Sequence, residues 1–186
     1  ETLSVVCRVR TGRWTSAQPV LAWPRYLFVG QLAVVYGMTG AQKLGPGWMP
    51  WGRWEALYRA LVRPTYTRHD FTWVAQVVEL TQALTLATWL FEVSWPVVLL
   101  AFWFRATRTR PGRLRSLFNR LDVRRFYLLG GMGLHVGISL TMDVGPFVAV
   151  LLAYYVCLVH PDELQALWRR WRPGLRGVSP ASGESR

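Results

Sequence analysis

Four apolar segments, separated by polar connections, constrain the fold of this chain more than any other feature. They cover about residues 21–42, 74–104, 126–142 and 146–160. At a rise of about 1.5 Å per residue, the first two can cross a hydrocarbon layer ~30 Å thick, and the third nearly so. The fourth is short, so it is tilted, extended by interfacial residues, or only a partial span. We predict an all-α integral membrane protein with four transmembrane helices within a domain covering residues 21–160.

The second apolar segment admits two interpretations. A helix over residues 71–104 would be roughly 50 Å long, which is more than one crossing needs. The segment contains no turn signal, so we predict a single helix that protrudes outward and is kinked at Pro96. Two spans are the alternative, and they would move the arginine-rich connection 105–125 to the other side of the membrane.

The formal net charge of +12 is distributed asymmetrically. With four spans, seventeen of the 22 cationic residues lie on one side, within residues 8–25, 105–125 and 169–186. The other side carries Lys43, Arg53, Arg59, Arg63 and Arg68. Loops rich in Lys and Arg stay in the cytoplasm, so we expect both termini there, in a bacterial cytoplasmic membrane. Anionic lipid headgroups explain the charge better than nucleic acid does.

The regions outside the spans have distinct compositions. Residues 1–20 form a basic lead-in without an initial Met or a signal peptide, so we expect the stretch to be processed or incomplete at its N-terminus. Helical periodicity over residues 54–62 predicts an interfacial helix within the connection 43–70. Residues 161–172 predict a second interfacial amphipathic helix. Residues 173–186 are rich in Pro, Gly and Ser, which predicts a disordered tail.

Lys43 is the only lysine in the chain, because the other 21 cationic residues are arginines. An amine differs from a guanidinium in having a compact head that can lose its proton when it is desolvated. Position 43, at the end of the first span, therefore predicts a functional amine. A lysine that extends its head to the membrane surface from a helix end is the structural alternative.

Three further ionisable residues lie within or at the end of the predicted spans, where charge is costly and usually functional. Counting helical rise from the arginines places Glu92 and His135 at similar depth near mid-bilayer, and Lys43 and Asp143 at the outer rim. We therefore predict two couples, Glu92 with His135 and Lys43 with Asp143. The central couple is either a buried hydrogen bond that holds two helices together or a proton-handling site.

Small residues predict where helices pack closely. Gly30 and Gly37 lie in the first span, and Gly133 and Gly137 form a GxxxG pattern around His135. The sequence contains no metal-ligand cluster, nucleophile elbow or phosphate loop, so we expect no metal and no reaction of those types.

Two stretches resemble one known family. Tyr36-Gly-Met-Thr-Gly-Ala-Gln-Lys-Leu-Gly-Pro-Gly-Trp48, with Gly52 and Glu55-Ala-Leu-Tyr58, resembles the Gly-x-x-Lys-Leu…Trp…Gly…Ala-Leu-Tyr pattern of the horizontally transferred transmembrane (HTTM) domain. Leu134-His-Val-Gly-Ile-Ser-Leu-Thr-Met-Asp-Val-Gly-Pro-Phe147 resembles that domain's His-containing hairpin. The resemblance covers about residues 26–165, the C-terminal portion of the domain. The hairpin is its more specific part.

The HTTM family includes vitamin K-dependent gamma-glutamyl carboxylase, in which the motif lysine is implicated as the base that initiates hydroquinone oxidation. The resemblance therefore implies Lys43 as a base, with desolvation supplying the free amine. This chain departs from the pattern, because Pro50 and Trp51 lengthen the spacing from Trp48 to Gly52. The stretch given contains no counterpart of the N-terminal spans or of the large extramembrane domain of the carboxylases, so we expect it not to carboxylate glutamate.

Two hypotheses follow. In the first, the chain is a non-catalytic subunit of a larger membrane complex, with lipids and other membrane subunits as partners. In the second, it is a membrane enzyme acting on a quinone-like or lipid ligand, with Lys43 and His135 catalytic. Glu92, Asp143 and Trp48 would then contact the ligand. The short chain favours the first hypothesis. A transporter has little support, because no inverted repeat is evident.

Overall fold

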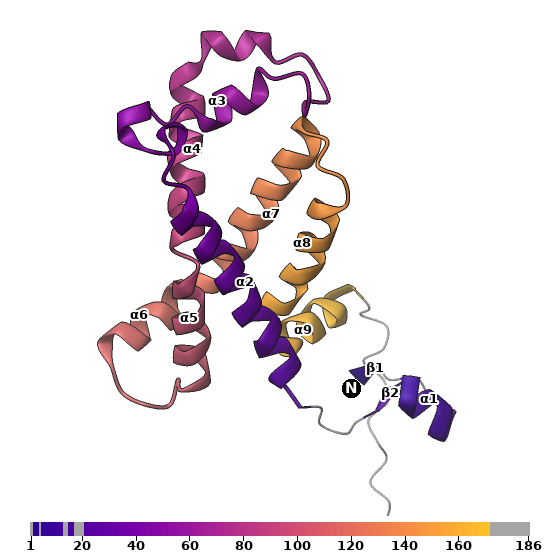
Figure 1. Ribbon diagram of the computed structural model, residues 1–186. Coiled ribbons are helices and arrows are strands. Elements are labelled where there is room, and N and C mark those ends of the chain that lie inside the picture. Colours follow the sequence, from indigo (N-terminus) through magenta and orange to yellow (C-terminus); the bar gives the residue numbers. More distant parts are fainter. Residues whose placement is uncertain (1, 4, 13–14, 17–20, 172–186) are drawn as a thin grey trace, which may run out of the picture.

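The computed structural model describes residues 2–3, 5–12, 15–16 and 21–171 (Figure 1). The described part confirms the all-α prediction: it forms a helical bundle, and its only strand pairing is the two-residue match of β1 (Thr2–Leu3) with β2 (Thr15–Ser16) around α1 (Val5–Thr11). The predicted tail 173–186 lies outside the described residues.

Four lengths of helix form the bundle. They are α2 (Trp23–Gln42), α4 with α5 (Val78–Val93 and Pro96–Ala106), α7 (Val123–Thr141), and α8 (Phe147–Tyr155), which ends in the 3-10 turn η4 (Val156–Leu158). Helix α2 packs against α4, α5 and α8, and α7 packs against α5 and α8. The core between them is aromatic and centres on Trp95, which is fully buried.

The second apolar segment is broken rather than continuous. A 3-10 turn, η3 (Thr72–Gln76), precedes α4, and the break at Ser94–Trp95 comes directly before Pro96, which lacks the N–H that would continue the helix. Within the described residues, no single helix is both long and apolar enough to cross a membrane. Helices α4 and α5 reach that length and hydropathy only as a pair, which is bent by 50°.

The connections gather at the two ends of the bundle (Figure 1). One end carries the turn between α7 and α8, together with η1 (Pro46–Trp48), η2 (Pro50–Gly52) and α3 (Ala56–Leu61). The opposite end carries α6 (Arg113–Leu121) and α9 (Pro161–Trp171). Helices α3 and α9 correspond to the predicted helices at 54–62 and 161–172. Helix α6 lies where the sequence analysis expected only a connection.

The glycines differ in what lies next to them. A Cβ at Gly37 would lie 3.3 Å from Pro96, and one at Gly131 would overlap the hydroxyl of Tyr155. At the other predicted packing positions, Gly30, Gly133 and Gly137, an added Cβ would meet no described atom within 4 Å. These three glycines therefore do not pack against another described helix of this chain.

A buried arginine fixes α9 to the end of the bundle that carries α6. We call this the arginine-rich end, because residues 105–125 contain eight arginines. The side chain of Arg124 donates to both carboxylate oxygens of Glu163, at 2.5 and 2.8 Å, and to the carbonyl of Leu158 at 2.6 Å. Glu163 also accepts a bond from the backbone N–H of His160 at 2.9 Å, as in a capping box. Hydrogen bonding to Arg124 holds the pKa of Glu163 well below its usual range.

The contrast between Gly131 and Gly133 gives a test of the packing. Gly131→Ala is expected to lower the free energy of unfolding by about 1–3 kcal/mol, because the methyl group must displace Tyr155. Gly133→Ala is expected to be neutral or to stabilise by up to ~1 kcal/mol, through the higher helix propensity of Ala. Denaturant unfolding in detergent micelles, followed by circular dichroism, measures both values. Equal effects of the two substitutions would contradict this packing.

The Arg124–Glu163 pair predicts a pH dependence. Because the pKa of Glu163 is lower in the folded than in the unfolded chain, the pair stabilises fully above the unfolded value of about 4.3 and loses its effect below it. Glu163→Gln should therefore cost about 1–3 kcal/mol at neutral pH. This cost should shrink as the pH falls from about 5 towards 3. The control is Asp162→Asn, whose exposed contact with Arg105 is 3.4 Å long and contributes less than about 0.5 kcal/mol.

Candidate functional site

The end of α2 places Lys43 at the side of α4. Lys43 is the residue that caps α2, and its backbone N–H bonds the carbonyl of Gly40 at 3.2 Å. Gly40 lies so close to α4 that a Cβ there would stand 2.7 Å from the backbone nitrogen of Val93. The indole of Trp89 donates a second hydrogen bond to the same Gly40 carbonyl, at 3.1 Å, and so ties the end of α2 to α4. The close approach of two backbones thus brings residue 43 next to Glu92.

Lys43 forms a largely buried ion pair with Glu92. Its Nζ lies 2.6 Å from Oε1 and 2.5 Å from Oε2, and the two side chains are 18% and 8% exposed. The ring of Trp48, in η1, covers the ammonium at 4.1 Å from Nζ to the ring centroid. A carboxylate and an aromatic face both attract a cation. Lys43 thus contacts two groups of the kind that bind a cation.

The observed pairs differ from the two predicted couples. Asp143 does not meet Lys43; its carboxylate is exposed and lies 3.3 Å from Arg68. A short antiparallel bridge between Thr67 and Met142 holds the α7–α8 turn against the segment before η3 and sets this pairing. The carboxylate of Glu92 pairs with Lys43 rather than with His135. The break before Pro96 changes the direction of the helix, so depths counted along a straight helix gave the wrong neighbour.

His135 is buried in a hydrogen-bonded group with two tyrosines. Its Nε2 bonds the hydroxyl of Tyr36, which in turn lies 2.7 Å from the hydroxyl of Tyr155. The ring of Tyr36 stacks on Trp95 with centroids 4.6 Å apart, so Tyr36 is held both by its ring and by its hydroxyl. The other ring nitrogen of His135, Nδ1, is buried and has no partner among the described residues. An unpaired polar atom of this kind is rare in protein interiors and indicates a missing partner.

One cavity joins these groups. It has a volume of about 350 Å³, and its wall includes Lys43, Trp48 and Glu92 at one side and Tyr36 and His135 at another. Thr39, Thr85 and Thr88 add hydroxyl groups, while Leu134, Ile138 and Leu151 supply apolar surface. We call this space the Lys43 cavity. Of the residues singled out from the sequence, Lys43, Glu92, His135 and Trp48 line it, whereas Asp143 does not.

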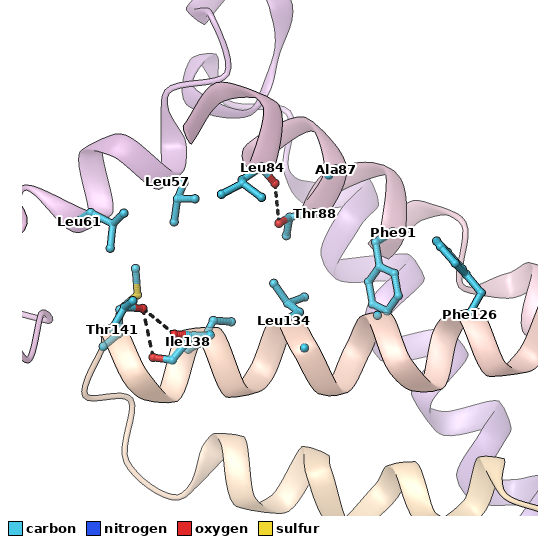
Figure 2. Close-up of a pocket in the computed structure, with 14 residues that line it drawn as sticks. Leu57, Leu61, Leu84, Ala87, Thr88, Phe91, Phe126, Leu134, Ile138 and Thr141 are labelled. Carbon is cyan, nitrogen blue, oxygen red and sulfur yellow. Dashed lines mark hydrogen bonds between the residues drawn. The ribbon is translucent and has the colours of Figure 1, made fainter. Parts of the chain in front are cut away.

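A second, larger space adjoins the Lys43 cavity. This apolar cleft, of about 500 Å³, lies between α3, α4 and α7. In Figure 2, Leu57, Leu61 and Leu84 lie on the side opposite Leu134 and Ile138 of α7. Gly130, Gly133 and Gly137 also line it, so the GxxxG face of α7 borders open space. The two spaces share Leu57, Thr88, Leu134, Ile138 and Met142 in their walls.

The sequence analysis did not single out Tyr36 and Tyr155. A signal for them existed, because each is a hydroxyl-bearing residue within an apolar segment, where a buried Tyr needs a hydrogen-bond partner. Their partners depend on the rotation of three helices, which the sequence does not give.

The site offers an amine, a carboxylate, an imidazole and one phenol around one cavity, and a second phenol, Tyr155, is hydrogen-bonded to Tyr36. In the part of the chain that the structure describes, no group of three or more His, Cys, Asp or Glu side chains comes together that could hold a metal ion. No family model, curated protein or solved structure matches this chain. What the site can do therefore follows from its own chemistry, which suits a ligand with a polar head and an apolar body.

The ion pair predicts a measurable coupling. Glu92→Gln alone is expected to cost about 2–4 kcal/mol, because it leaves the Lys43 ammonium without its counter-ion. Adding Lys43→Met should recover at least about half of that loss, since two well-packed neutral side chains need no partner. Unfolding free energies of the wild type, both single variants and the double variant measure the coupling.

The matched control is Glu55→Gln. Its partner, Arg59, lies 3.0 Å away one helical turn on and is mostly exposed, so less than about 0.5 kcal/mol is expected. If Glu92→Gln cost no more than this control, the pair would not stabilise the fold.

Proposed function

We propose that this chain is a ligand-binding, non-catalytic subunit of a membrane protein assembly. Its ligand is an amphiphile, a lipid or a quinone-like molecule, whose polar head lies in the Lys43 cavity. The single observation that carries this proposal is the position of Lys43. Its amine contacts Glu92 and the ring of Trp48 in the wall of a cavity that is otherwise largely apolar.

The outer surface of the bundle supports a membrane location. Large apolar side chains on every long helix are strongly exposed, such as Val34 on α2, Leu90 on α4, Trp103 on α5, Leu140 on α7 and Val150 on α8. A water-soluble monomer rarely exposes apolar surface on this scale. The charged connections lie at the two ends of the bundle, with the greater number of arginines at the end that carries α6 and α9. This distribution suits a bundle that crosses a bilayer with that end in the cytoplasm.

The polar groups of the Lys43 cavity indicate the class of ligand. Lys43 can donate to a carbonyl or phosphate oxygen beside Glu92, and His135 Nδ1 is a further hydrogen-bonding atom without a described partner. The adjoining apolar cleft offers about 500 Å³ for a hydrocarbon tail. A molecule with both parts would satisfy the unpaired nitrogen and fill apolar space at once.

A binding role suits Lys43 better than a base role. A general base needs a free electron pair within reach of the proton that it removes. The contacts of this amine are those of a cation, with two carboxylate oxygens within 2.6 Å. Gly30, Gly133 and Gly137, which meet no other described helix, leave backbone surface where a neighbouring subunit could approach.

The second candidate is a membrane enzyme in which Lys43 acts as a base on a quinone-like or lipid ligand. It rests on the resemblance to the HTTM domain, and the observation in its favour is that Lys43 and His135, from the two resembling stretches, line the same cavity. In this mechanism the ligand would have to separate Lys43 from Glu92 before the amine could accept a proton.

The single lysine allows a direct test of binding. Reductive methylation modifies only Lys43 among the side chains, and mass spectrometry counts the methyl groups. The two probes are decylubiquinone and dihexanoyl phosphatidylglycerol, which carry different head groups. We expect the one whose head group fits the Lys43 cavity to slow the modification of Lys43 several-fold in the detergent-purified chain. Glu92→Gln should remove most of this protection, because it alters the polar wall. No protection by either compound would overturn the proposal.

Lys43→Arg separates the two candidates. A binding subunit should retain its assembly, and its ligand should still quench tryptophan fluorescence. Its affinity should fall by no more than about tenfold, since the charge is kept although the wider guanidinium fits Glu92 and Trp48 less well. An enzyme that uses a free amine should instead lose turnover while its assembly stays normal. Lys43→Met, which removes the charge, is the matched variant and should weaken binding in both cases.

A further inference from the structure

Two short helices, α6 and α9, lie at the arginine-rich end of the bundle (Figure 1), and each leaves a row of apolar side chains exposed. On α6, Leu114, Leu117 and Leu121 lie at i, i+3 and i+7, which places them along one side of the helix. On α9, Leu164, Leu167 and Trp171 repeat the same spacing. All six side chains are between 46% and 80% exposed.

Polar contacts hold α6 in this orientation. Arg115 donates to the hydroxyl of Thr107 at 3.1 Å and to the carbonyls of Arg110 and Pro111, and Asn119 donates to the carbonyl of Phe104 at 3.1 Å. The ring of Phe118 meets Phe104 edge to face. The side of α6 that meets α5 therefore combines Arg115 and Asn119 with one aromatic ring, and the leucine side stays open.

Helix α9 is attached in the same way. Glu163 binds the guanidinium of Arg124, and Asp162 lies 3.4 Å from Arg105 of α5. The charged first turn of α9 thus faces the bundle. Leu164 and Leu167 instead border a shallow groove of about 250 Å³ with Leu128 and Leu129 of α7.

This arrangement is the reverse of what a water-soluble protein would use. An amphipathic helix on a soluble domain buries its apolar face and exposes its charges. Helices of nine and eleven residues are also too short to be stable without tertiary contacts. Fixing both through polar groups, with six large apolar side chains left outward, implies an apolar medium next to this end of the bundle.

The charge around α6 identifies that medium. Residues 105–125 contain eight arginines and a single acidic residue, Asp122. At about 100° per residue, Arg113 and Arg120 border the leucine row of α6. Leucines flanked by arginines match the boundary between acyl chains and anionic phosphate groups, where long cationic side chains extend to the headgroups.

We infer that α6 and α9 form a lipid-binding collar, whose six apolar side chains insert into an anionic phospholipid leaflet while Arg113 and Arg120 contact headgroup phosphates. This inference rests on the membrane location in the proposed function. It adds a separate lipid surface, at the opposite end of the bundle from the Lys43 cavity, and it defines the class of lipid. Each exposed arginine near an anionic surface strengthens such binding about fivefold.

The test uses spin labels on the full chain in lipid nanodiscs, in a background with Cys7→Ser and Cys157→Ala. A label at Leu117→Cys should show a several-fold higher ratio of oxygen to nickel-chelate accessibility than one at Ser116→Cys, which lies about 100° around α6 from Leu117 and outside the leucine row. The matched pair on α9 is Leu167→Cys and Ala166→Cys. The difference should be larger in discs that contain phosphatidylglycerol than in discs of phosphatidylcholine alone. The double substitution Arg113→Gln and Arg120→Gln should reduce the increase that phosphatidylglycerol causes.

Three outcomes would overturn the inference. Equal, water-like ratios at 117 and 116 in anionic discs would show that the leucine face is in solvent. Shielding of 117 from both reagents would show that a protein surface covers it. Equal ratios in the two lipids would remove the role of anionic headgroups. Failure of the proposed function is distinguishable, because a chain that is not in a membrane would not remain in the discs, and a chain without a ligand would still give the label pattern.

Discussion

Helix α2 crosses the break between α4 and α5 at two glycines, and most of the described site depends on that crossing. Gly37 rests against Pro96, and Gly40 rests against the backbone at Val93. Tyr36, the residue before Gly37, stacks on the buried Trp95, which lies in the break itself. The crossing fixes the end of α2 against α4, and it therefore sets the ion pair of Lys43 with Glu92. It also places the Tyr36 hydroxyl where His135 and Tyr155 reach it.

The buried polar groups are arranged in three levels along the bundle. Lys43 and Glu92 occupy one end, the Tyr36–His135–Tyr155 group lies in the middle, and Arg124 with Glu163 closes the other end. Both buried ion pairs place the cation against a carboxylate at 2.5 Å, and burial without such partners would be costly. The two ion pairs thus provide charges with partners. The middle group contains an atom, His135 Nδ1, that has no described partner.

The sequence was sufficient for the all-α class and for the approximate limits of α2, α7 and α8. These features depend on local composition and periodicity. It was insufficient for the partners, because partners depend on helix rotation and on the break before Pro96. Asp143 illustrates this, since its neighbour is set by the bridge between Thr67 and Met142, which no local pattern indicates. Likewise, nothing local distinguishes Gly131, which touches Tyr155, from Gly133, which borders the cleft.

The sequence analysis also missed helix α6, although the sequence carries a helical signal there. The spacing of Leu114, Leu117 and Leu121 is helical, but the arginines between them led to an interpretation as a connection. A segment whose charges hold it to the bundle and whose leucines point outward does not fit the usual pattern of a soluble helix. Charge content alone is therefore a poor criterion for a loop at the end of an apolar bundle.

The presence of lysine at position 43 can now be explained by size as well as by proton chemistry. Its Nζ lies within 2.6 Å of both oxygens of Glu92 and at 4.1 Å from the centroid of the Trp48 ring. A compact ammonium can meet both oxygens and the ring from one point, whereas a planar guanidinium spreads its donors over a wider fork. The geometry of the contacts thus accounts for a lysine in a chain that otherwise uses arginine. The loss of a proton is not needed to explain the choice, which is consistent with a binding role for this residue.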